Sequence, residues 1–225
     1  GGGIEAMTEI GDAISGAKVP IFVFVDGRAI SAGAYIALSA EKIVMSPDAV
    51  LGASQPRTIS GEEVAGKEMA AMRKMFRAAA EARAQRTGVE LDPRVAEAMV
   101  DQEIEVEGVV KKGELLALTA TEALELGYAD FAAKNRGEAE AVLGLNHLIP
   151  VEVKQTPVEG LVRFLTDPYV SPFLLTIGFT ALIIEAFTAG FGAPGIIGSL
   201  CLILFFGARL LSGLAGVEVI LLFLL

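Results

Sequence analysis

Ser31 is the residue of this chain best placed to act as a nucleophile. It stands in the segment AISAG at positions 29–33, where an apolar run gives way to small residues. A serine at the turn from a strand into a helix holds its hydroxyl at the carboxyl end of a sheet, and the helix amides point at the group it attacks. Serine also caps helices, so the segment alone leaves both interpretations open.

The base that would accept the serine proton is not a histidine. The one histidine, His147, lies beside a linker-like stretch far along the chain, which disfavours a Ser-His-Asp triad. A lysine whose pKa is lowered by burial can take this role. Lys67 is the candidate, because it opens a helix rich in methionine, although an ordinary exposed lysine fits the same position. Spacing alone leaves four competitors open: Lys42, Lys74, Lys111 and Lys112.

Three consecutive glycines at the start of the chain are a candidate for holding an oxyanion. Gly1, Gly2 and Gly3 precede an apolar helix, and glycine lets backbone amides approach a ligand closely. A cut chain end or a purification remnant explains the glycines equally well.

Composition excludes several classes of function. The net charge is −10 and the pI is about 4.7, so the chain lacks the clustered basic residues that a nucleic acid partner requires. The single cysteine, Cys201, lies in the apolar C-terminal part, which rules out a disulfide framework and a thiolate metal cluster. We expect chemistry that needs no metal or nucleotide cofactor.

The elements that would position these residues alternate between helices and strands, which predicts an α/β fold with a largely parallel sheet. The apolar run IFVFV suits a central strand covered on both faces. Helices are expected at 4–16, 32–40, 66–87 and 93–101, strands at 21–25, 41–46 and 103–110, and a further helix from Thr119 or Thr121 to Gly127.

The C-terminal part reads as a membrane anchor. Residues 172–225 contain only three charged residues, Glu185, Arg209 and Glu218. We predict spans at 172–190 and 195–213, joined at FGAPG into a helical hairpin, and a truncated third span from 217. Residues 1–150 would form the water-soluble head and 151–171 a linker. Glu185 and Arg209 would lie at different depths, with Arg209 reaching toward the membrane interface.

Taken in order, several segments resemble the NfeD-type membrane-bound ClpP-class serine proteases. These segments are GGGIEAMTEI, the apolar strand, AISAGAYIALSAEKIVMSPDAVLGAS, the Lys67 helix ending at AEARAQRTG, AEAMVDQEIEV and LTATEALELGYAD. The resemblance implies a ClpP/crotonase-like α/β spiral followed by the membrane hairpin. It implies Ser31 as nucleophile and Lys67 as general base, with Lys74 as the alternative base if the register shifts. It also implies an oxyanion site at Gly2, Gly3 and the amide of Ala32.

The same resemblance implies a stomatin- or flotillin-like membrane protein as substrate or partner and a protease head outside the cytoplasm. It further implies a strand before the glycines and a small β-barrel domain after the spans, which lie beyond this sequence. The alanine- and methionine-rich faces of the long helix predict a homo-oligomer.

Three functions follow as hypotheses. The first is a membrane-anchored endopeptidase that uses a Ser/Lys dyad on hydrophobic peptide segments. The second is a non-catalytic or weakly catalytic scaffold that binds a stomatin- or flotillin-like partner. The third, a crotonase-like acyl-CoA enzyme, has little support, since no acidic pair for a thioester is recognisable and a membrane hairpin is unusual for it.

Overall fold

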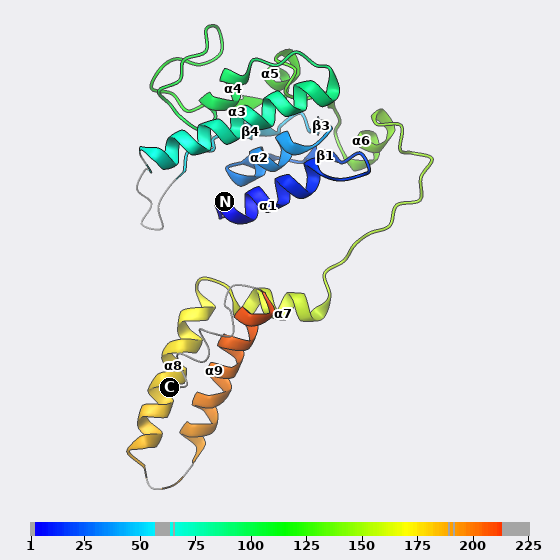
Figure 1. Ribbon diagram of the computed structural model, residues 1–225. Helices are drawn as coiled ribbons and strands as arrows, with labels where there is room; N and C mark the ends of the chain where they lie inside the picture. The colour runs from blue at the N-terminus through cyan, green and yellow to red at the C-terminus, as the bar shows by residue number, and fades with distance from the viewer. Residues whose placement is uncertain (1–2, 57–63, 65, 189, 191, 213–225) are drawn as a thin grey trace. The chain divides into compact units, whose positions relative to one another are not determined.

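The computed structural model describes residues 3–56, 64, 66–188, 190 and 192–212, and divides the chain into two compact units, Gly1–Ile149 and Pro150–Leu225. Figure 1 shows the elements of each unit. The bounds expected for the head, linker and membrane region stay a prediction, and a helix lies inside the range expected as linker. The third span expected from 217 lies outside the described residues.

The first unit contains two small sheets and the helices packed on them. The helices are α1 (Ile4–Ser15), α2 (Ala32–Ser39), α3 (Lys67–Thr87), α4 (Pro93–Ala98), α5 (Ala120–Glu125) and α6 (Arg136–Val142). The strands are β1 (Phe22–Val25), β2 (Arg28–Ile30), β3 (Lys42–Met45), β4 (Val50–Gly52), β5 (Ala117–Thr119) and β6 (Phe131–Ala132). One sheet has the order β1-β3-β6 and the other β2-β4-β5. Three of the four strand pairs are parallel, and β4 with β5 is antiparallel.

Two expectations about the strands are wrong. Among the described residues, the run IFVFV forms β1 at an edge of its sheet, and the strand of that sheet paired on both sides is β3, with three of its four residues buried. Residues 103–110 form no strand. Gly108 turns the chain there with a φ of 76°, so that Val106 and Val110 face each other across an isolated bridge.

Helices α1, α2 and α3 run side by side in the first unit (Figure 1). Gly11 makes the close approach of α1 to α2 possible, since a Cβ at this position would lie 2.5 Å from Cε1 of Tyr35. Phe76 of α3 is fully buried, and the centroid of its ring lies 5.4 Å from the ring centroid of Tyr35. This packing fixes α1 and α3 around α2, whose N-terminus follows Ser31.

A buried ion pair ties the end of α3 to β6. Arg83 is 0% exposed and donates to the carboxylate of Asp130 and, at 3.1 Å, to the carbonyl of Gly127. Lys42 lies 3.0 Å from the other oxygen of Asp130. Burial lowers the pKa of Arg83, and Asp130 opposes that effect.

The described residues of the second unit form three apolar helices: α7 (Pro157–Leu165), α8 (Val170–Ala186) and α9 (Ala193–Leu211). In the described part of the chain, α9 is the one helix that is by itself long and apolar enough to cross a membrane, whereas α7 and α8 meet that criterion only together, across a bend of 69°. Helices α8 and α9 pack closely through glycines, since a Cβ at Gly198 would lie 2.9 Å from the carbonyl oxygen of Gly178.

Helices α8 and α9 each contain one charged residue, and each of these side chains has hydrogen-bond partners within the second unit. The carboxylate of Glu185 accepts hydrogen bonds from the amides of Gly192 and, at 2.9 Å, Gly195, so it caps the start of α9. Arg209 donates to the hydroxyl of Ser171 and its guanidinium lies 3.8 Å from the ring centroid of Phe205. The bond to Ser171 joins the end of α9 to the start of α8, and the expected reach of Arg209 toward the interface stays a prediction.

Candidate active site

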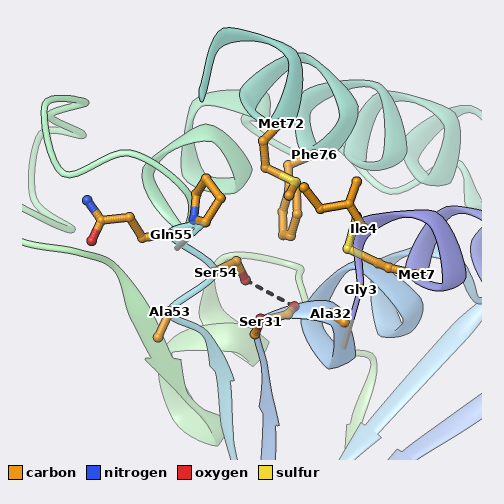
Figure 2. Close-up of a pocket in the computed structure, with 11 residues that line it drawn as sticks. Gly3, Ile4, Met7, Ser31, Ala32, Ala53, Ser54, Gln55, Met72 and Phe76 are labelled. Carbon is orange, nitrogen blue, oxygen red and sulfur yellow. Dashed lines mark hydrogen bonds between the residues drawn. The ribbon is translucent and has the colours of Figure 1, made fainter. Parts of the chain in front are cut away.

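A pocket of about 530 Å³ opens beside Ser31. Helix α1, the start of α2, the segment after β4 and the middle of α3 contribute its wall. Figure 2 shows Met72 and Phe76 reaching from α3 toward the Ser31 turn, with Ile4 and Met7 of α1 beside them. The wall facing Ser31 is thus largely apolar.

The backbone of Ser31 is strained. It has φ 56° and ψ −129°, values that residues with a Cβ seldom adopt, and such a conformation costs on the order of 1–3 kcal/mol. Its amide donates to the carbonyl of Gly52 at 3.2 Å, which fixes the turn against β4. Ser31 precedes α2, yet its side chain makes no capping hydrogen bond to that helix. The hydroxyl therefore lines the pocket without serving as a cap.

The segment after β4 forms the second strained edge of the pocket. Ala53 has φ 42°, and the hydroxyl of the next residue, Ser54, lies 3.3 Å from the carbonyl oxygen of Ser31 and 3.0 Å from that of Gly52. Because β2 and β4 are parallel, their carboxyl ends bring Ser31 and Ser54 to the same edge of the sheet. The dashed line in Figure 2 marks the bond between them.

Two of the three residues expected to hold an oxyanion line this pocket. Gly3 immediately precedes α1 and Ala32 is the first residue of α2, and both are among the lining residues. The first amides of a helix have no acceptor within it, so the amide of Ala32 is available to a ligand beside Ser31. Gly2 lies outside the described residues.

The expected base does not lie in the pocket. Lys67 is the first residue of α3, its side chain is 91% exposed, and its ammonium lies 4.0 Å from the carboxylate of Glu68. Lys67 lies five positions before Met72, so the two side chains point about 140° apart around the helix axis. The alternative, Lys74, is 72% exposed and lies 3.7 Å from Glu97. His147 is exposed on the segment after α6.

No ionisable side chain belongs to the described residues that line the pocket. Of the site residues predicted from the sequence, the pocket is lined by Ser31, Gly3 and Ala32. Sequence reasoning missed Ser54 and the apolar wall of Met7, Met72 and Phe76. The small residues that end a second strand, in DAVLGAS, were the available signal for Ser54.

Comparison with known families decides what kind of protein carries this site. Residues 1–155 match the NfeD1b N-terminal domain, and residues 169–225 match the NfeD integral membrane domain. The chain belongs to the NfeD family. Together these matches include both structural units, and they confirm the resemblance seen in the sequence. The protein is a membrane protein with one or two candidate spans among its described residues.

Two curated relatives of this NfeD chain match it over most or all of its length. Membrane protein NfeD1b of Bacillus subtilis is 37% identical over 100% of this chain and 50% of the relative. Membrane-bound protease PH1510 of Pyrococcus horikoshii is 30% identical over 91% of this chain and 48% of the relative. The chain therefore spans about half the length of the curated relatives it matches.

The fold agrees with a solved protease structure. A variant of the 1510-N membrane-bound stomatin-specific protease has a TM-score of 0.50 and 26% identity, over 63% of each chain. A second variant of that protease, a lysine-to-alanine replacement solved with a substrate peptide, has the same TM-score and identity over 62% of this chain and 59% of the other. The first unit thus has the ClpP/crotonase-like α/β fold expected from the sequence, and apolar helices follow it.

Proposed function

We propose that this chain is the catalytic and membrane-anchoring part of a multi-pass membrane serine endopeptidase, with Ser31 as its nucleophile. The observation that carries the proposal is the conformation of Ser31, which is strained, lines a pocket and leaves its hydroxyl free of any helix-capping bond. Strain of this kind persists where a function needs it. The relationship to a membrane-bound protease supports the same assignment.

In the proposed reaction, the hydroxyl of Ser31 gives its proton to a lysine amine while its oxygen bonds to the carbonyl carbon of a peptide. The amides of Ala32 and Gly3, together with Gly2, stabilise the resulting oxyanion. The lysine returns the proton to the leaving amine as the peptide bond breaks. Water then hydrolyses the acyl-enzyme and regenerates Ser31, so no metal or nucleotide is consumed.

Lys67 is the proposed base and Lys74 its alternative, and either must move to act. The side chain of Lys67 is exposed, whereas a general base must lie within hydrogen-bond reach of the proton it accepts. Catalytic contacts are often long before substrate binds. We therefore assign to peptide binding the movement that brings a lysine of α3 to Ser31.

The proposed substrates are hydrophobic peptide segments of membrane-associated proteins. Met72, Phe76 and Met7 give the pocket an apolar wall that suits such side chains. The related 1510-N protease is named as specific for stomatin, which supports a stomatin- or flotillin-like protein as substrate or partner. We further propose that the head lies outside the cytoplasm and that the chain assembles as a homo-oligomer.

Cleavage of hydrophobic peptides by the detergent-solubilised chain tests the proposal. We expect Ser31→Ala to lower the cleavage rate at least a hundredfold, and the exposed serine variant Ser15→Ala to cleave as the parent does. Cleavage by Ser31→Ala at the parental rate would refute the assignment of Ser31.

A second candidate function is a scaffold that binds a stomatin-like partner without turnover. The scaffold function is favoured because none of the described residues that line the pocket has an ionisable side chain. The Bacillus subtilis relative is named only as a membrane protein, which is compatible with such a role. Undetectable cleavage by the parent, with equal partner binding by Ser31→Ala, would favour this alternative.

A further inference from the structure

Helix α7 exposes a row of apolar side chains that the described residues of its own unit leave uncovered. Val158, Leu161 and Phe164 are 62%, 54% and 59% exposed, although only nine residues make up the helix. At 100° per residue these three positions lie on one side of the helix. The neighbouring Leu165 is buried and Val162 half-buried, so the apolar face continues beyond the part that packs on the other helices.

The opposite side of α7 is polar. Glu159 and Arg163 are exposed there and are one turn apart, and Thr156 begins the helix with a capping box that Glu159 completes. A helix with an apolar arc on one side and charges on the other is typical of segments that lie in the plane of a membrane surface.

The direction of α7 agrees with such a position. The bend between α7 and α8 is 69°, so α7 runs closer to perpendicular than parallel to α8. Helix α8 has 17 residues, a length of about 26 Å, which approaches the hydrocarbon thickness without help from α7. If α8 crosses the bilayer along its own axis, α7 lies along the surface.

Exposed aromatic side chains lie where α7 meets α8. Tyr169 is 81% exposed immediately before α8 and Phe173 is exposed on its first turn. Tyrosine at the end of a spanning helix is typical of the boundary between headgroups and acyl chains. The bond from Arg209 to Ser171 places a cation of α9 at this end of the pair as well.

We propose that α7 is a surface-bound helix that lies in the headgroup layer of the bilayer, with Leu161 and Phe164 buried among the upper acyl carbons and Glu159 and Arg163 in water. It would fix the depth at which α8 and α9 cross. This inference concerns the second unit alone and holds whether or not Ser31 is catalytic.

Tryptophan placement tests the proposal sharply, because the chain contains no tryptophan. We would prepare Phe164→Trp and, as the matched control on the polar side of the same helix, Glu159→Trp. Ile203→Trp, in the middle of α9, marks the membrane interior. Each full chain is reconstituted in phosphatidylcholine vesicles, and quenching by lipids brominated at shallow or deep acyl positions is compared.

We expect Phe164→Trp to be quenched at least twofold more by the shallow bromines than by the deep ones, Ile203→Trp to show the reverse, and Glu159→Trp to be quenched little by either. Absence of quenching at both α7 positions would overturn the proposal, since α7 would lie in water. Deep quenching at both would also overturn it, since α7 and α8 would then form one broken span.

Discussion

The hydroxyl of Ser54 donates to the backbone carbonyl of Ser31, across 3.3 Å. The same hydroxyl lies 3.0 Å from the carbonyl of Gly52, which itself accepts the amide of Ser31. Gly52, the last residue of β4, and Ser54, which lies two positions further on, thus hold the strained turn that follows β2. Ser54 is buried, and these two carbonyls satisfy its hydroxyl.

Replacement of Ser54 by alanine should loosen that turn without removing any reacting atom. We expect a loss of stability of about 1 kcal/mol from the lost hydrogen bond. Displacement of the nucleophile should lower kcat for peptide cleavage roughly tenfold to a hundredfold, with KM nearly unchanged. Steady-state kinetics of Ser54→Ala and of the exposed control Ser15→Ala separate these effects. Equal kcat in Ser54→Ala and parent would show that the turn holds its shape without this bond.

The buried ion pair of Arg83 and Asp130 should dominate the stability of the first unit. Arg83→Met leaves the buried carboxylate of Asp130 with the partly exposed Lys42 and the amide of Ile43 as its partners, and such a loss costs about 3–5 kcal/mol. Arg77→Met, which breaks partly exposed pairs with Glu81 and Glu97, should cost about 1 kcal/mol or less. Thermal unfolding by circular dichroism compares the variants, and similar melting temperatures would contradict the expected difference.

The capping box of α5 makes a pH-dependent contribution. The amide of Thr119 and then its hydroxyl hold the pKa of Glu122 below the usual value of 4.5. A carboxyl with a lowered folded-state pKa stabilises the fold above its unfolded pKa, and the contribution is lost as pH falls through the folded-state pKa. We therefore expect Glu122→Gln to lower Tm at pH 7 and to have a smaller effect at pH 3. Glu125→Gln, also exposed on α5, serves as the control. An effect of Glu122→Gln that is equal at both pH values would contradict this account.

Local sequence signals predicted much of the fold. The long helix α3 follows from a run of alanine, methionine, arginine and glutamate without glycine or proline, and Thr119 caps α5 as expected. Strands β2, β4, β5 and β6 were missed, because each has only two or three residues and is defined by pairing with other strands rather than by a local pattern. The alternation at 103–110 misled because Gly108 turns the chain within it.

The candidate site was predicted in part for the same reason. Ser31 and Ala32 are neighbours in sequence at a strand-to-helix turn, so a local motif identifies them. Ser54 joins them only through the pairing of β2 with β4, which no local pattern reveals. The sequence correctly predicted that Lys67 lies in a helix. It did not predict which side of that helix faces the pocket, since this depends on how α3 packs.

The most direct test of the central claim is to label the detergent-solubilised chain with a fluorophosphonate and to locate the adduct by mass spectrometry. Parent, Ser31→Ala, Lys67→Ala, Lys74→Ala and the exposed control Lys18→Ala would be compared, with peptide cleavage measured in parallel. We predict an adduct on Ser31 that is absent from Ser31→Ala, is lost in Lys67→Ala and persists in Lys18→Ala. Loss in Lys74→Ala instead would move the base to that lysine. A parent chain that neither forms an adduct on Ser31 nor cleaves peptides would contradict the assignment of Ser31 as a nucleophile.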